Sequence, residues 1–218
     1  MPKQTFLNLK SSKKSLITEA FLREFSVKTF DDASLSDVVK NIGIAKGSVY
    51  QYFDDKLDLF FYLVQESTMV KMKYVGSVKR EDHPDYWTFF KVLYEHGLQF
   101  DRESPLQSHF LHNLVNNLHS PSVAQWYRDM EKQIVTAFEG MAKMEIDLGC
   151  FRDDIPLDVM GFMLYKVGAA IQNQLEYSGI IESAISIQKN EPVFAGKEEI
   201  VMDLVDKHIQ LVRPAFDK

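Results

Sequence analysis

The chain has 218 residues, of which 45% are hydrophobic, so it has room for a small module and a larger domain and is too apolar to be disordered. Its single cysteine, Cys150, excludes an internal disulfide and suits a reducing cytosol, so we expect a cytoplasmic protein. The sequence has no cleavable leader and no run of 18 apolar residues, which argues against secretion and against a membrane partner.

The net charge of −6 argues at first sight against a nucleic-acid partner. The charge is unevenly distributed. Residues 1–56 hold nine Lys and Arg against seven Asp and Glu, a net charge of +2, while residues 57–218 hold sixteen against twenty-four, a net charge of −8. The electrostatic field that would attract phosphate is therefore at the N-terminal end.

Residues 1–10 are expected to form a frayed arm before the first helix. Ser11 or Ser12 can cap that helix. Lys13 and Lys14 lie at its start, where cations are poorly placed for the helix dipole, and this favours a role in contacting phosphate. The alternative is that both lysines are simply solvated.

The stretch from Ser34 to Leu59 predicts a short helix, a tight turn, a second short helix and the start of a long one. Ser34 is a good N-cap, and apolar residues follow it at helical spacing: Leu35, Val38, Val39 and Ile42. Gly43 can adopt the left-handed conformation that ends the first helix and redirects the chain. Two short helices joined by such a turn form a helix-turn-helix pattern, whose second helix would enter a DNA major groove.

The second short helix is rich in hydrogen-bond donors. Lys46, Ser48 and Gln51 can reach phosphates or base edges, and two tyrosine hydroxyls can donate to phosphates. Gly47 would let the backbone approach DNA closely. The alternatives are that Gly47 merely weakens the helix and that the tyrosines belong to the core.

These residues resemble the signature of the tetracycline-repressor (TetR) family of bacterial regulators, a resemblance that covers about the first quarter of the chain. It is carried by Gly43, Gly47, Tyr50, Tyr52, Phe53 and Lys56. The family resemblance and the donor pattern together predict the DNA-binding residues Lys13, Lys14, Ser34, Ser36, Lys46, Gly47, Ser48, Tyr50, Gln51, Tyr52 and Lys56. The chain departs from the family pattern where Ala45 replaces a capping Ser or Thr and Thr29 replaces a glycine.

The predicted fold class is all-α, with an N-terminal three-helix DNA-binding domain containing the helix-turn-helix and a C-terminal helical domain for ligand binding and dimerisation, about nine helices in all. We place the domains at residues 1–56 and 57–218, with a fourth helix from about 56 to 79 as the connector. Proline and glycine punctuate the later helices, and the last helix runs from about Lys197 to Val212.

The last two long helices carry more apolar surface than one face needs, which predicts a homodimer that would match a palindromic operator. An intramolecular core is the alternative. The predicted interface residues are Met160, Met163, Leu164, Val167, Ile171, Leu175, Ile200, Leu204 and Ile209.

The middle helices mix aromatic side chains with scattered polar groups, a composition typical of small-molecule sites and equally of an ordinary helical core. The family resemblance implies a pocket for a small, largely hydrophobic effector in this region. The candidate lining residues are Tyr62, Tyr86, Phe90, Tyr94, Phe110, Asn113, Asn117, Trp126, Met130, Phe138 and Tyr165.

No catalytic motif is recognised, and we expect neither a cofactor nor an enzymatic activity. His109, His112 and His119 suggest a metal site only weakly, because no acidic or cysteine ligand has fixed spacing to them. The sequence therefore predicts a ligand-responsive regulator, most simply a repressor released from its operator by the effector. The alternatives are an all-helical enzyme or ligand-binding protein with a vestigial head, and an architectural DNA-binding protein.

Overall fold

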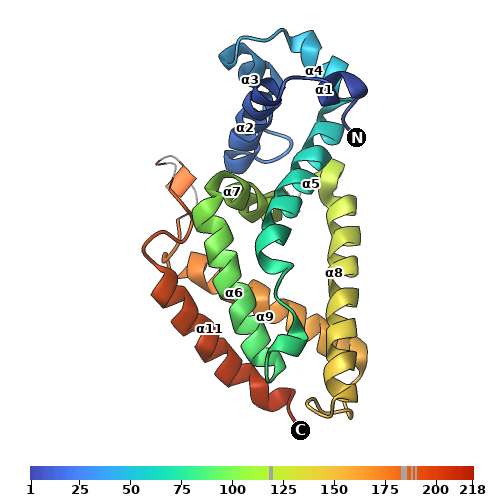
Figure 1. Cartoon of the computed structure of the whole chain (residues 1–218), viewed down its shortest axis with the longest axis vertical. Coiled ribbons are helices and arrows are strands. Elements are labelled where there is room, and N and C mark those ends of the chain that lie inside the picture. The colour runs from blue at the N-terminus through green and yellow to red at the C-terminus, as the bar shows by residue number, and fades with distance from the viewer. Residues whose placement is uncertain (118–119, 183–185, 188, 190) are drawn as a thin grey trace. The chain divides into compact units, whose positions relative to one another are not determined.

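We describe the protein from a computed structural model that covers residues 1–117, 120–182, 186–187, 189 and 191–218 (Figure 1). In this part of the chain the named elements are all helices. The α-helices are α1 (Gln4–Leu7), α2 (Ser11–Val27), α3 (Leu35–Asn41), α4 (Lys46–Tyr52), α5 (Lys56–Val75), α6 (Tyr86–Glu103), α7 (Pro105–Asn113), α8 (Pro121–Asp147), α9 (Leu157–Tyr177) and α11 (Glu198–Val212). The 3-10 helices are η1 (Arg80–Asp82), η2 (Leu114–Asn117) and η3 (Arg213–Ala215).

The predicted all-α fold, with an N-terminal helix-turn-helix followed by a helical body, is confirmed. The last helix begins within a residue of its predicted start. The connector helix α5 is shorter than predicted and ends at Val75, because Gly76 and Ser77 are poor helix formers and the Ser77 hydroxyl bonds the Tyr74 carbonyl at 3.2 Å. The predicted polar loop at residues 186–196 lies partly outside the described residues.

Contacts divide the chain into two compact units. Unit 1 comprises residues 1–73, 100–125 and 183–193, and unit 2 comprises residues 74–99, 126–182 and 194–218. Unit 1 thus holds the helix-turn-helix together with α7, which packs on α2. The boundary predicted at residue 56 separates a DNA-binding domain from a regulatory domain, and it stays a prediction. None of the helices in the described ranges is long and apolar enough to cross a membrane.

Four phenylalanine rings form the core of unit 1. The ring of Phe60 on α5 lies 5.3 Å from those of both Phe25 and Phe30, and 5.6 Å from that of Phe110 on α7. All four side chains are buried, and the rings around Phe60 meet it edge to face, the favourable aromatic geometry. This cluster joins the helix-turn-helix segment to α7 within one core.

A second aromatic core lies in unit 2. Tyr86 and Trp87 at the start of α6 pack on Phe151, with ring centroids 5.5 and 5.8 Å away, and Trp87 also contacts Phe216 at 5.6 Å. The Trp87 indole nitrogen donates to Asp217 at 2.8 Å. Since Phe151 and Asp217 also form a backbone bridge, the C-terminal residues are held in this core.

A buried ion pair orders the segment between α5 and α6. Arg80 in η1 donates to the Glu145 carboxylate on α8, with Nη2 and Oε2 2.8 Å apart, and Nη1 donates to the His83 carbonyl at 2.7 Å. Glu145 is fully buried and Arg80 is 12% exposed. Two parallel bonds to a planar guanidinium compensate the cost of burying the carboxylate.

Helices α8 and α9 approach closely at Gly161, which is the reason for glycine there. A β-carbon at this position would lie 2.7 Å from the backbone nitrogen of Glu139 and 2.8 Å from its Cα. Backbone atoms cannot move aside as a flexible side chain can. Gly161 therefore serves packing inside the protomer.

We predict that Gly161→Ala lowers the free energy of unfolding by about 1–3 kcal/mol, because the added methyl group forces α8 and α9 apart. Gly140→Ala is the matched control, because a β-carbon there meets nothing within 4 Å and the change should raise helix stability by up to about 1 kcal/mol. Urea unfolding at fixed protein concentration measures both. Equal stability of the two variants would contradict the close approach.

The buried imidazole of His109 lies in unit 1. Its Nε2 donates to the carbonyl of Glu191 at 2.8 Å, while Nδ1 is buried and has no hydrogen-bond partner. Burial lowers the pKa of His109 below its usual value, partly opposed by the bond to Glu191 and the charge of Asp101. The folded protein therefore favours a neutral ring.

We predict that stability falls as the pH drops from 7 through the pKa of an unfolded histidine, about 6.5, towards the lower folded value, because the unfolded chain then binds the extra proton. One such group contributes at most about 1.4 kcal/mol per pH unit. His109→Gln, which keeps a donor for Glu191, should flatten this slope in urea titrations. His83→Gln is the control, and an unchanged slope in His109→Gln would contradict the assignment.

Candidate nucleic-acid interface

The helix-turn-helix is formed by α3, the turn at Gly43 and α4. The Ser34 hydroxyl accepts a bond from the Asp37 amide at 3.3 Å and so caps α3, as its sequence position predicts. The Ser34 amide in turn donates to Glu24 on α2 at 2.7 Å. Gly43 has φ 70°, a left-handed conformation in which a side chain would be strained.

Helix α4 presents a polar face. Lys46, Gly47, Tyr50 and Gln51 are exposed, Ser48 is half-buried, and only Val49 and Tyr52 are buried. No side chain caps the helix at Ala45. The exposed set contains an ammonium, an amide and a phenol, which are the groups that bind phosphates and base edges.

The other predicted contact residues differ in whether their polar groups already form hydrogen bonds within the protein. Lys13 and Ser36 are exposed. The Lys14 ammonium donates to the Leu7 carbonyl at 3.1 Å. The Lys56 ammonium donates to the Asp31 carbonyl at 3.3 Å and lies 4.9 Å from the centre of the Phe30 ring, where desolvation lowers its pKa. Tyr52 is buried, so its packing role is visible here while its DNA role stays a prediction.

The prediction of a frayed N-terminal arm is wrong. Residues 4–7 form α1, which packs on α4 (Figure 1). Lys3 donates from its backbone nitrogen to the Tyr52 carbonyl at 2.8 Å, and its ammonium donates to the Tyr50 carbonyl at 2.9 Å. The buried ring of Phe6 holds the segment in place. The sequence signal was Phe6 with its apolar neighbours Leu7 and Leu9, which a frayed arm would leave exposed.

Two asparagines that the sequence suggested for a ligand pocket bind the turn after α2, and their role as pocket residues stays a prediction. The side-chain amide of Asn113 donates to the Phe25 and Lys28 carbonyls at 2.9 and 3.0 Å. The side-chain oxygen of Asn117 accepts a bond from the Phe30 amide. These bonds satisfy backbone groups at a helix end where the TetR family pattern has a glycine and this chain has Thr29.

The remaining candidate pocket residues are distributed over both units. In unit 1, Tyr62 packs on Phe6 and Phe53 at 5.3 and 5.4 Å, and Phe110 belongs to the phenylalanine core. In unit 2, Tyr86, Phe90 and Tyr94 form a continuous row on α6, with successive ring centroids 6.1 and 5.2 Å apart. The predicted set is therefore divided between the two units, and its role as one pocket stays a prediction.

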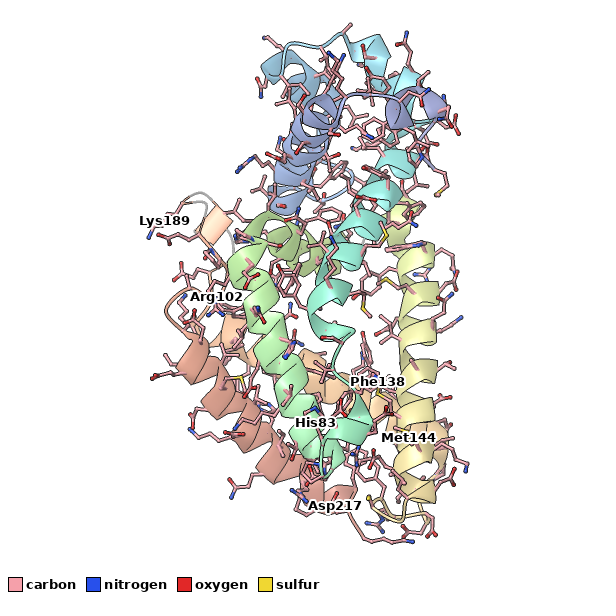
Figure 2. All side chains as sticks on the ribbon, in the orientation of Figure 1. His83, Arg102, Phe138, Met144, Lys189 and Asp217 are labelled. Carbon is pink, nitrogen blue, oxygen red and sulfur yellow. The ribbon has the colours of Figure 1, made fainter. Side chains whose placement is uncertain are left out.

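Helices α8 and α9 in unit 2 bring a second group together. Phe138, which Figure 2 shows projecting from α8, lies 6.1 Å from the ring of Tyr165 on α9. The Tyr165 hydroxyl and the Lys166 ammonium both donate to Glu131 at 3.0 Å. Trp126 and Met130 are half-buried on the same helix as Phe138. Their role as pocket residues stays a prediction.

Helix α9 has two apolar faces. The predicted interface residues that are buried within the protomer are Met160, Leu164, Val167, Ile171 and Leu175. They pack inside unit 2, as the intramolecular alternative expects. Val159, Phe162 and Met163 are 46–47% exposed, and so is Ile200 on α11 at 50%. Leu204 and Ile209 are half-buried.

In the described part of the chain, no group of three or more His, Cys, Asp or Glu side chains is arranged to hold a metal ion. His109 is used to hold the Glu191 backbone, and His119 lies outside the described residues.

Residues 17–63, which include the whole helix-turn-helix, match the family model of bacterial regulatory proteins of the tetR family. Residues 17–63 are therefore similar to the DNA-binding segment of tetR-family regulators. The match covers most of α2, the helix-turn-helix and the start of α5.

Comparison of sequences points to the same class. The chain is 29% identical over 102 residues to an HTH-type transcriptional regulator of Staphylococcus aureus strain bovine RF122 / ET3-1, a match covering 44% of this chain. The chain spans about half the length of the curated relatives it matches, 55% in this case.

Solved structures agree on the fold. A TetR family transcriptional regulator from Chloroflexus aurantiacus J-10-FL is similar over 100% of this chain and 99% of its own, with a TM-score of 0.78 and 23% identity. The SmeT–triclosan complex is similar over 95% of this chain and 93% of its own, with a TM-score of 0.64 and 12% identity.

We predict that Asn113→Ala destabilises the protein by about 1–3 kcal/mol, because it leaves two carbonyls at the end of α2 without their donor. Thermal or urea unfolding measures the loss. Asn41→Ala, at an exposed position of α3, is the control. A variant as stable as the wild type would show that water replaces the asparagine without cost.

Proposed function

We propose that the protein is a ligand-responsive transcriptional regulator that binds a palindromic operator as a dimer and is released by a small, largely hydrophobic molecule. The observation that carries the proposal is the exposed donor face of α4, set on a helix-turn-helix that matches the tetR family. Operator binding in this class of proteins is commonly repressive.

DNA binding is supported by charge as well as shape. The segment 1–56 has a net charge of +2 in a chain of −6, so the phosphate-attracting field coincides with α4. Lys46 and Lys13 extend into solvent and are the best candidates for phosphate contacts. Gln51 and Tyr50, on the same helix, are candidates for base edges and phosphates.

Dimerisation is supported by the outer face of α9. Val159, Phe162 and Met163 leave almost half of their surfaces exposed, although the buried face of the same helix already completes the core of unit 2. The Phe162 ring also lies under the Lys166 ammonium at 5.1 Å. We therefore propose that α9 contacts a second copy through these exposed residues together with Ile200 on α11, while the buried residues stabilise the helix from inside.

The effector is proposed from the aromatic groups of unit 2. Tyr86, Phe90 and Tyr94 on α6, and Phe138 with Tyr165 between α8 and α9, would suit an apolar or aromatic molecule with a few polar groups. SmeT, a structural neighbour, is seen in complex with triclosan. Release requires that the effector bind more tightly to the conformation that cannot hold the operator.

The experiment is selection of bound DNA from a random pool by the wild-type protein. We predict an enriched palindrome, because each of two copies would read one half-site. Lys46→Ala/Tyr50→Ala should then weaken binding to that palindrome at least about tenfold and lower the salt dependence by about one unit per lost phosphate contact.

Lys132→Ala/Tyr177→Ala is the matched control, because it removes an exposed lysine and an exposed tyrosine from unit 2. Absence of any enriched sequence would overturn the proposed regulatory function and favour the alternative of a helical ligand-binding protein with a vestigial DNA-binding domain. Enrichment of a sequence that is not a palindrome would overturn the proposal that the protein binds DNA as a dimer. An effector that leaves operator affinity unchanged at saturation would overturn the proposed release.

A further inference from the structure

The C-terminal end of α4 is closed by a segment about fifty residues away in sequence. The last carbonyls of a helix have no partner within it. Here three successive carbonyls are bonded by residues that precede α2: Tyr50 O by the Lys3 ammonium at 2.9 Å, Gln51 O by the Thr5 hydroxyl, and Tyr52 O by the Lys3 amide at 2.8 Å. We call residues 3–7 the N-terminal strap.

Phe6 anchors the strap in the core. Its side chain is 1% exposed, and its ring centroid lies 5.7 Å from that of Tyr52 and 4.9 Å from that of Phe53. On the other side it meets Tyr62 of α5 at 5.3 Å. The ring therefore wedges between the end of α4 and the helix that follows it, and this sets the angle between the two.

The strap also changes the electrostatics of the DNA-facing end. The Lys3 ammonium lies 2.9 Å from the carboxylate of Asp54, which is 75% exposed just after α4. The hydrogen bond and charge of Lys3 hold the pKa of Asp54 below its usual value, so the carboxylate stays ionised and paired. Without Lys3, a bare negative charge would remain beside the surface proposed to meet phosphates.

Helix α4 needs outside support. It has seven residues, far fewer than an isolated helix requires in water, and Ala45 supplies no N-terminal cap. Its polar face is exposed and so adds little packing. Its orientation must come from Val49, Tyr52 and the groups that bond its C-terminal end.

We propose that Lys3, Thr5 and Phe6 are positioning residues for operator reading. The strap holds α4 in one orientation, so that the protein distinguishes its operator from other DNA without the strap itself contacting bases. This inference rests on the proposed DNA-binding function and adds the element that determines its specificity. The family match begins at residue 17 and leaves the strap outside it.

The test compares full-length variants in solution, using the palindrome selected by the wild type and a scrambled duplex of equal length. Lys3→Met/Thr5→Val removes both side-chain donors and keeps their apolar volume. We expect about tenfold weaker binding to the palindrome, the effect of losing hydrogen bonds to helix-end carbonyls, and much less change on the scrambled duplex. Thr5→Ser retains a hydroxyl and should bind like the wild type.

Salt dependence separates positioning from direct contact. If the strap only positions α4, Thr5→Val, which removes no charge, should weaken palindrome binding without changing the slope of log affinity against log salt. Because Lys3→Met also leaves Asp54 unpaired, the charge-neutral Thr5→Val decides the matter, and equal losses on both duplexes in Thr5→Val would overturn the positioning role.

Ser178→Ala is the matched control. It removes a hydroxyl that bonds the Gln174 carbonyl at 2.7 Å at the end of α9, the same kind of bond in unit 2. Thermal unfolding checks that all variants are folded at the assay temperature. A wild type that enriches no sequence overturns the proposed regulator itself. A wild type that selects a palindrome, which Lys3→Met/Thr5→Val binds equally well, overturns only the strap.

Discussion

A helix of seven residues cannot hold its own conformation in water, and the helix-turn-helix of this protein depends on such a helix. Nucleating a helix costs more free energy than the hydrogen bonds of one or two turns contribute. Helix α4 is therefore stable only because other parts of the chain bond to it and cover it. Phe6 covers one end of it, and Lys3 and Thr5 bond its terminal carbonyls. The exposed polar side chains of α4, which we propose face DNA, therefore do not have to pack in the core.

The same constraint appears at the end of α2, where the chain turns into the helix-turn-helix. A glycine would make that turn by its own backbone freedom, but this chain has Thr29 and uses Asn113 and Asn117 as outside partners. Asn113 comes from α7 and Asn117 from η2, and α7 shares a phenylalanine core with α2 and α5. A displacement of α7 would therefore shift the turn that leads into the helix-turn-helix, because hydrogen bonds and packed rings both connect the two.

Unit 2 combines tight packing with an unused apolar surface. Gly161 lets α8 and α9 approach until backbone meets backbone, and Arg80 pairs with a carboxylate that has no access to water. Such features require a well-defined interior. Phe162 and Met163 stay exposed on the outer face of the same helix, which is the distribution expected where a second surface is meant to be covered.

The sequence alone was sufficient for the all-helical class, the helix-turn-helix and the polar face of α4, because helical periodicity, the Ser34 cap and the turn at Gly43 act over neighbouring residues. It could not show that residues 3–7 close α4 or that Asn113 closes α2. Those bonds join residues 46 to 88 positions apart, and hydrogen-bonding groups give no sign in the sequence of which distant carbonyl they will meet. The sequence likewise shows which residues of α9 are apolar. Only tertiary packing decides which of them are buried in the protomer and which stay exposed.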